Sequence, residues 1–217
     1  MSKILILPGD GIGEEVTKQC LKILDYLNSE TNYNFEYKEG LFGGASIDDC
    51  GKPLSNEVLD LAMESDAVLL GAVGGPKWES LDHNLKPEKG LLTLRKELGT
   101  FANLRPGKVF PALANASSLK SEVLKGTDIF VVRELTGGIY FGEPRYSKII
   151  DKKRVASNPL IYNEDEIARV AHEAFKISLK RNKKVTSLDK ANVLAVPVLK
   201  LVTDANAPIS KDVILVE

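Results

Sequence analysis

Short apolar runs alternate with segments of helical periodicity along the N-terminal half of the chain. The apolar runs predict strands at Ile4–Leu7, Asn34–Lys38 and Ala67–Val73. The last run is apolar throughout, which is typical of a parallel sheet covered on both faces. The intervening segments predict helices at Glu14–Leu27, near Leu54–Ala62 with Ser55 as the N-cap, and at Glu88–Leu98. The pattern favours an α/β fold.

The second half of the chain is more mixed. Two predicted strands, Phe101–Pro106 and Ile129–Val132, each place an arginine at their end. A polar turn between two short β-like segments then predicts a protruding hairpin, Tyr146–Ile150 with Arg154–Ser157. Further on, Asn163-Glu164-Asp165-Glu166 is a capping box that opens a long helix. A last strand is predicted at Val185–Leu188.

Composition excludes several classes of function. Hydrophobic residues make up 43% of the chain, charged residues 27%, and the net charge is -1, so no overall field favours nucleic acid or an anionic membrane. No apolar run approaches the ~20 residues that cross a bilayer, and the N-terminus lacks a signal-peptide layout, so a cytoplasmic protein is expected. Cys20 and Cys50 are expected to be reduced thiols, and His83 and His172 lack metal-ligand spacing.

The first loop, Pro8-Gly9-Asp10-Gly11-Ile12-Gly13, lies between a strand and a helix and invites comparison with a dinucleotide fingerprint. The third glycine of that fingerprint is replaced by Glu14, whose carboxylate would repel a pyrophosphate. We therefore interpret the loop as a structural turn and not as a Rossmann site.

A second glycine loop, Gly74-Gly75-Pro76-Lys77-Trp78, follows the apolar strand Ala67–Val73. Ligands of open α/β sheets bind beyond the carboxyl ends of strands, so these five residues are candidates for cofactor contact. A plain turn is the alternative interpretation, because a Gly-Gly-Pro sequence by itself has little specificity.

The predicted helix after this loop presents a mixed face. Glu88, Leu91, Leu92 and Arg95 share one side of it, so that a carboxylate and a guanidinium bracket two leucines. An ordinary core stripe with charged ends explains this pattern. A site for a small branched acid would require the same combination of an apolar patch and an anion clamp.

Three arginines stand in otherwise apolar settings. Arg95, Arg105 and Arg133 together suggest a small polyanionic ligand, whereas a single such residue would be explained by a salt bridge. Tyr140 follows the Gly137-Gly138 turn after Arg133, and Lys190 follows the last predicted strand. A lysine there is normally solvated, but it can transfer protons if it is desolvated.

Several ordered motifs resemble the isocitrate/isopropylmalate dehydrogenase family over roughly residues 1 to 195, with the closest likeness to its isopropylmalate branch. The motifs are Pro-Gly-Asp-Gly-Ile-Gly, Gly71–Trp78, Gly90-Leu91-Leu92 through Arg95, Ala102–Pro106, Arg133–Gly142 and Ser187–Leu194. The resemblance implies an α/β fold distinct from Rossmann. It also implies NAD-dependent oxidation and decarboxylation of 3-isopropylmalate to 4-methyl-2-oxopentanoate in leucine biosynthesis, with Mg or Mn, by a homodimer.

The resemblance also implies roles for individual residues. The three arginines would hold the malate carboxylates, and Leu91 and Leu92 would contact the isopropyl group. Glu88 and the Gly74–Trp78 loop would line the cofactor cleft. Lys190 would accept the hydroxyl proton across a subunit interface, and Tyr140 would protonate the enolate. The expected domains are 1–100, the N-terminal part of a first domain, and 101–195, part of a second domain with a dimer arm near 142–160.

Residues 196–217 depart from the family pattern, and Pro197 breaks a helix expected there. Metal-binding aspartates and the adenosine loop have no counterpart in the sequence, so we identify no metal ligand and expect a truncated member with little activity as this chain alone. A non-catalytic remnant or dimerising interaction module is the alternative. A sister enzyme acting on isocitrate or tartrate is disfavoured by the leucine pair, and NAD is not distinguished from NADP.

Overall fold

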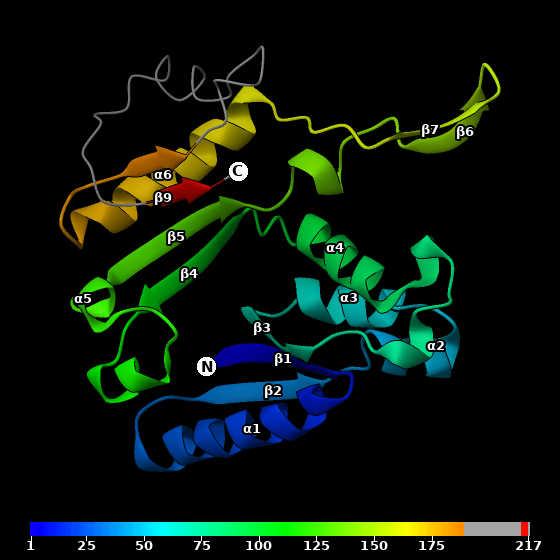
Figure 1. Cartoon of the computed structure of the whole chain (residues 1–217). Coiled ribbons are helices and arrows are strands. Elements are labelled where there is room, and N and C mark those ends of the chain that lie inside the picture. Colours follow the sequence, from blue (N-terminus) through cyan, green and yellow to red (C-terminus); the bar gives the residue numbers. More distant parts are fainter. Residues whose placement is uncertain (189–213, 217) are drawn as a thin grey trace. The chain divides into compact units, whose positions relative to one another are not determined.

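The computed structural model describes residues 1–188 and 214–216, and the chain divides into two compact units, Met1–Gly99 and Thr100–Glu217. Each unit has its own sheet and core (Figure 1). Of the sequence predictions, those for Lys190 and for most of the tail after Ala195 fall outside the described residues.

The first unit contains a three-stranded parallel sheet in the order β2-β1-β3. Its elements are β1 (Ser2–Gly9), α1 (Ile12–Glu30), β2 (Phe35–Glu39), α2 (Gly44–Cys50), α3 (Asn56–Met63), β3 (Ala67–Ala72), two 3-10 turns η1 (Pro76–Trp78) and η2 (His83–Leu85), and α4 (Pro87–Glu97). Helix α1 covers one face of the sheet, and α3 and α4 lie on the other (Figure 1). The predicted strands and helices are confirmed, with ends shifted by a few residues.

Strand alternation explains the core of this unit. Leu5 and Leu7 point to the same face of β1 and pack with Phe42 from the loop before α2. Val58 and Ala62 of α3 and Leu94 of α4 complete this cluster. The predicted N-cap of α3 is also confirmed, because the Ser55 hydroxyl accepts a hydrogen bond from the Val58 amide at 3.2 Å.

The second unit contains a four-stranded sheet in the order β4-β5-β9-β8 and a separate hairpin, β6-β7. Its elements are β4 (Ala102–Lys108), η3 (Pro111–Ala116), α5 (Ser121–Leu124), β5 (Asp128–Glu134), η4 (Gly138–Tyr140), β6 (Tyr146–Ile150), β7 (Lys153–Ser157), α6 (Glu164–Leu179), β8 (Thr186–Leu188) and β9 (Ile214–Val216). Strands β4 and β5 are antiparallel, whereas β9 runs parallel to both β5 and β8. Val132 of β5 packs against Val170 and Ala174 of α6 in the core.

The prediction that arginines end two strands is wrong in detail. Strand β4 continues through Pro106 to Lys108, so Arg105 lies in the middle of the strand, and β5 ends at Glu134, one residue after Arg133. A proline is tolerated inside β4 because β4 is an edge strand, where a missing N–H breaks no ladder bond.

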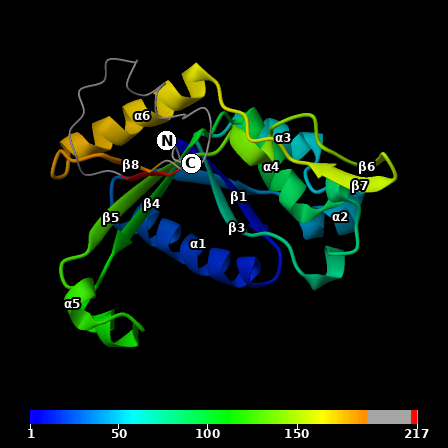
Figure 2. The same ribbon diagram turned by 45° about the horizontal axis from the view of Figure 1, so that its top comes forward.

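The predicted hairpin and capping box are both confirmed. Strands β6 and β7 extend away from the four-stranded sheet of their unit (Figures 1 and 2), and Asp151 and Lys152 form the turn between them, both with positive φ. At the start of α6 the side chains of Asn163 and Glu166 each accept a hydrogen bond from the other's main-chain amide. Both cysteines are free thiols, as expected.

Candidate functional site

The predicted cofactor loop of the first unit is fixed to helix α2. The Gly74 amide donates to the buried carboxylate of Asp10 at 2.7 Å. At the other end of the loop, Asp48 of α2 accepts hydrogen bonds from Lys77 at 2.6 Å and from the Trp78 indole at 3.2 Å. These two hydrogen bonds also lower the pKa of the Asp48 carboxyl, with that from Lys77 the larger cause. The loop is therefore fixed at both ends by hydrogen bonds to aspartate side chains and is not an unconstrained turn.

Glu88 lies beside this loop, as part of the first turn of α4. A Cβ atom at Gly74 would collide with the Glu88 carboxylate, so the two predicted cofactor residues are immediate neighbours. Helix α4 begins at Pro87, whose fixed φ suits a first helical position. In the first unit, the Glu88 carboxylate therefore lies directly against the main chain of Gly74.

The two leucines of α4 have different surroundings. Leu91 packs against the core cluster of the first unit, whereas Leu92 is half-buried and is not part of that cluster. Arg95 is half-buried one turn further along the same helix. The core interpretation of the sequence therefore describes Leu91 better than it describes Leu92.

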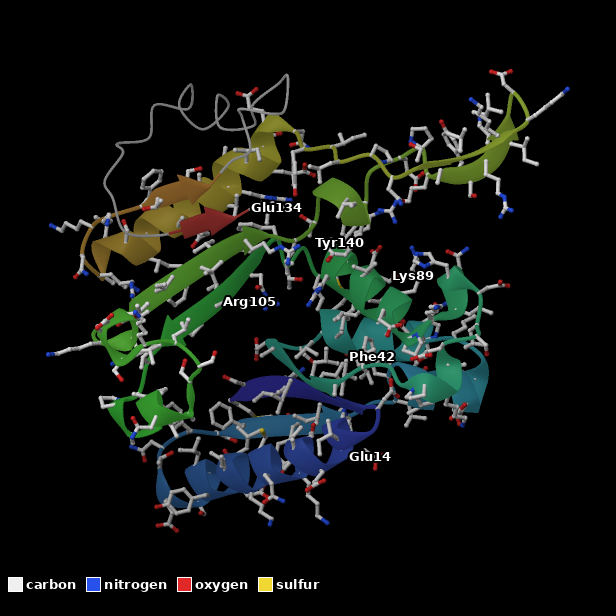
Figure 3. All side chains as sticks on the ribbon, in the orientation of Figure 1. Glu14, Phe42, Lys89, Arg105, Glu134 and Tyr140 are labelled. Atoms are coloured by element: carbon white, nitrogen blue, oxygen red, sulfur yellow. The ribbon has the colours of Figure 1, made fainter. Side chains whose placement is uncertain are left out.

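In the second unit, Arg105 and Arg133 lie on the same face of the sheet. Strand register pairs Arg105 with Val131 and Asn103 with Arg133, so the two arginines are diagonal neighbours on adjacent strands. Val132 and Glu134 alternate with them and are buried on the opposite face, where α6 packs. Arg105 is exposed, and its Nε donates to Asn103 at 2.5 Å. Figure 3 shows Arg105 on β4, and Glu134 at the end of β5.

Tyr140 lies next to Arg133. The Arg133 guanidinium is 5.8 Å from the centroid of the Tyr140 ring, and Tyr140 remains 46% exposed at the end of η4. An exposed phenol beside a cation can exchange protons with a ligand held by that cation. Within the second unit, therefore, Arg133 lies beside both Tyr140 and Arg105, whereas Arg95 belongs to the first unit.

A residue that sequence reasoning missed, Glu134, holds the turn between Arg133 and Tyr140. Its buried carboxylate accepts hydrogen bonds from the Thr136 amide at 2.8 Å, the Thr136 hydroxyl at 2.8 Å and the Gly137 amide at 2.7 Å. Arg169 of α6 forms an ion pair with the same carboxylate at 3.1 Å. The signal in the sequence was a carboxylate three residues before Gly137, a position from which a side chain can accept from nearby main-chain amides.

The first unit also contains a cavity of about 530 Å³ that the sequence did not reveal. It opens at the carboxyl ends of β1 and β2, beside the start of α1. None of the predicted cofactor residues lines it. Its lining is Pro8, Gly9, Glu14, Thr17, Lys18, Leu21, Glu39, Gly40, Leu41, Phe42 and Ala45. The volume lies in the range of small-molecule pockets.

Within the part of the chain that the structure describes, no group of three or more His, Cys, Asp or Glu side chains is arranged to hold a metal ion. Among the helices of residues 1–188, none is both long and apolar enough to cross a membrane.

Comparison with known proteins identifies the family of the chain. Residues 3–212 match the family model described as isocitrate/isopropylmalate dehydrogenase. The chain is 55% identical, over 91% of its length, to 3-isopropylmalate dehydrogenase from Aquifex aeolicus, and it covers 54% of that protein. It is also 55% identical, over 89% of its length, to 3-isopropylmalate dehydrogenase from Hydrogenovibrio crunogenus, covering 55% of that protein. The chain thus spans about half the length of the curated relatives that it matches.

Solved structures show the same fold. Isocitrate dehydrogenase from Methylococcus capsulatus matches with a TM-score of 0.76 and 22% identity, over 99% of this chain and 60% of that one. A β-decarboxylating dehydrogenase from Thermococcus kodakarensis matches with a TM-score of 0.67 and 27% identity, over 99% of this chain and 64% of that one. The predicted fold class, an α/β fold of this type, is confirmed.

Proposed function

Because this chain belongs to the isocitrate/isopropylmalate dehydrogenase family, we propose that the protein it forms oxidises and decarboxylates 3-isopropylmalate, with NAD, to 4-methyl-2-oxopentanoate in leucine biosynthesis. The observation that carries the proposal is the high identity to relatives named 3-isopropylmalate dehydrogenase along nearly the whole of this chain. The geometry of each unit supports it separately.

The second unit supplies a dicarboxylate clamp. Two guanidiniums on one face of a sheet repel each other unless an anion lies between or beside them, and a carboxylate accepts paired N–H groups of arginine well. Arg105 and Arg133 satisfy this arrangement, and Arg95 is proposed as the third carboxylate ligand. Leu92 is proposed to contact the isopropyl group of the substrate, and Leu91, which packs against the core cluster, to support this contact.

The residues of the first unit fit a nicotinamide. The Gly74–Trp78 loop exposes main chain at the carboxyl end of β3, and the Glu88 carboxylate beside Gly74 complements a positively charged ring. When bound, NAD would accept the hydride from C2 of the substrate. Gly74, Gly75, Pro76, Lys77, Trp78 and Glu88 are the residues proposed to hold it.

Two proton transfers are assigned to side chains. Oxidation of the C2 hydroxyl releases a proton, which Lys190, a residue outside the described part of the chain, is proposed to accept. Loss of carbon dioxide from the carboxylate on C3 leaves an enolate. Tyr140 is then proposed to donate its phenolic proton to C3, for which its exposure and its position beside Arg133 are suited.

The divalent cation expected from the family does not fit the described residues, since residues 1–188 and 214–216 contain no suitable cluster of ligands. No step is therefore assigned to Mg or Mn. The assembly is proposed to be a cytoplasmic homodimer in which the hairpin β6-β7 serves as an arm. The adjacent exposed side chains of Ile149 and Ile150 offer apolar surface for such a contact.

The test is an assay of the complete product of the gene that encodes this chain. NAD reduction with 3-isopropylmalate should exceed that with isocitrate or malate, and 4-methyl-2-oxopentanoate and carbon dioxide should form in equal amounts. The same gene should restore growth without leucine to a bacterial strain that lacks the enzyme. A preference for isocitrate would contradict the proposal. Binding of 3-isopropylmalate without turnover would instead favour a non-catalytic binding module.

A further inference from the structure

Asp10 is a buried carboxylate that joins two segments distant in sequence. Its side chain is within hydrogen-bonding distance of three main-chain amides, and the residue is only 4% exposed. Oδ2 accepts from Gly44 at 2.9 Å and from Gly74 at 2.7 Å, and Oδ1 accepts from Ala45 at 2.9 Å. The start of α2 and the loop after β3 are thus tied to one side chain at the end of β1.

Two glycines leave room for the close contacts around the Asp10 side chain. A Cβ at Gly43 would collide with the Asp10 carboxylate, and a Cβ at Gly44 would overlap the indole of Trp78. Trp78 therefore lies directly on the main chain that Asp10 holds. The main chain of Asp10 adds a further tie, because its amide donates to the carbonyl of Ala72 at 2.8 Å.

We propose that Asp10 is a positioning residue for the Gly74–Trp78 loop. Its hydrogen bonds keep Gly74 beside Glu88 and keep the Trp78 indole packed on the start of α2. The inference rests on the proposed function, which gives this loop its contact with the nicotinamide. Asp10 itself is buried beneath the loop and acts through it.

A carboxylate is required for this role because all of its partners are donors. Asparagine has nearly the same shape, but one of its two polar atoms is itself a donor and would face a main-chain N–H. Asp10→Asn therefore leaves at least one of the three amides without an acceptor inside the protein, where an unpaired donor is costly. The loop is expected to relieve this by moving away from α2.

The chain contains a single tryptophan, so its fluorescence reports on this loop alone. In the 217-residue chain without ligand, Asp10→Asn should shift the Trp78 emission to longer wavelength and increase its quenching by acrylamide. Asp49→Asn, which changes an exposed carboxylate on the same helix α2, is the matched control and should match the parent. Equal quenching in the parent and Asp10→Asn would overturn the inference, whether or not the proposed function holds.

Kinetics of the complete gene product separate positioning from general loss of structure. Asp10→Asn should raise the KM for NAD about tenfold or more, as expected for a lost hydrogen bond to a charged group, while the KM for 3-isopropylmalate changes little. Equal rises in both KM values would show a merely structural role and contradict the inference. Failure of the parent to use any dinucleotide would refute the proposed function. The fluorescence comparison would still show whether Asp10 positions the loop.

Hydrogen exchange of the parent keeps the inference testable if Asp10→Asn does not fold. The Gly74 amide should exchange as slowly as the amides inside β1, because it donates to a buried acceptor. The amide of Gly75, its neighbour, serves as the internal reference and should exchange faster. Rapid exchange at Gly74 would show that the tie to Asp10 does not persist in solution.

Discussion

Tyr140 has its ring beside the Arg133 guanidinium and is 46% exposed, and we propose it as the proton donor to the enolate. Tyr140→Phe in the complete gene product should therefore lower kcat by about 10²–10⁴-fold, the usual contribution of a general acid. The dissociation constant for 3-isopropylmalate should change little, because the arginines remain. Steady-state kinetics combined with calorimetric titration would measure both.

Tyr33→Phe is a suitable control for this substitution. Tyr33 is exposed, stacks on Phe35 with ring centroids 5.4 Å apart, and belongs to none of the segments proposed to bind substrate or NAD. A kcat in Tyr140→Phe as high as that of Tyr33→Phe would remove Tyr140 from the proposed proton transfer.

Leu91 and Leu92 are adjacent, but only Leu91 packs against the core cluster, and we propose different roles for them. Leu91→Ala should lower the free energy of unfolding by about 2 kcal/mol, at the low end for a leucine that packs against a core and is only partly buried. Leu92→Ala should cost less stability but reduce discrimination of 3-isopropylmalate over malate by roughly 1–3 kcal/mol in kcat/KM. Denaturant titration measures the loss of stability, and competitive kinetics measure the loss of discrimination. A larger loss of stability in Leu92→Ala, with a larger loss of discrimination in Leu91→Ala, would show that the assignment is wrong.

Asp48 should make the stability of the cofactor loop depend on pH in the acidic range. Hydrogen bonds from Lys77 and Trp78 lower the pKa of this carboxyl, so its contribution is fully present above the ordinary carboxyl pKa and is lost as pH falls through the lowered value. Trp78 emission should therefore begin to change below about pH 4 while the circular dichroism of the first unit persists. In Asp48→Asn the emission should no longer respond in that range, and an unchanged acid transition would place its origin elsewhere.

At the scale of single elements, the N-terminal capping box should contribute measurably to the stability of helix α6. Its capping box supplies acceptors for main-chain amides that the helix cannot satisfy internally, so Asn163→Ala should cost about 1 kcal/mol of unfolding free energy. Urea titration measures this difference. Asn158→Ala, at an exposed position before the helix, should be close to neutral. Equal stability of the two variants would show that solvent replaces the cap without cost.

Local signals such as this cap were readable from the sequence because they depend on residues a few positions apart. The strands of the first unit, the Ser55 cap and the β6-β7 hairpin were predicted for the same reason. The position of Arg105 was misjudged, because Pro106 suggests a strand end unless the strand is known to lie at a sheet edge. The tie between Asp10 and Gly74 spans 64 residues and could not be read from the sequence. The ties of Glu134 are local, but they also depend on the direction of the main chain in the turn, which the residue types alone do not determine.

At the scale of the whole molecule, the first unit should fold on its own. Every residue of its buried cluster lies between Leu5 and Leu94, inside Met1–Gly99. A fragment of residues 1–99 should unfold cooperatively and retain the Trp78 emission of the parent. A fragment that stops at Leu85 loses α4 and the buried Leu94, and it should not fold. An unfolded 1–99 fragment would show that this core depends on the second unit.

The turn at Asp151 and Lys152 has a consequence for how an arm of this kind responds to dilution. Both residues adopt positive φ without being glycine, which costs Lys152 roughly 1–2 kcal/mol and Asp151 less, because its short polar side chain tolerates this region. A lone two-stranded hairpin is also only marginally stable in water. If the arm is an interface between two copies, its folding is sustained by mass action, because the contact formed on association must offset that cost. Dissociation and melting of the hairpin then become one event. The midpoint of that event would rise with protein concentration, whereas the midpoint of the first unit would not.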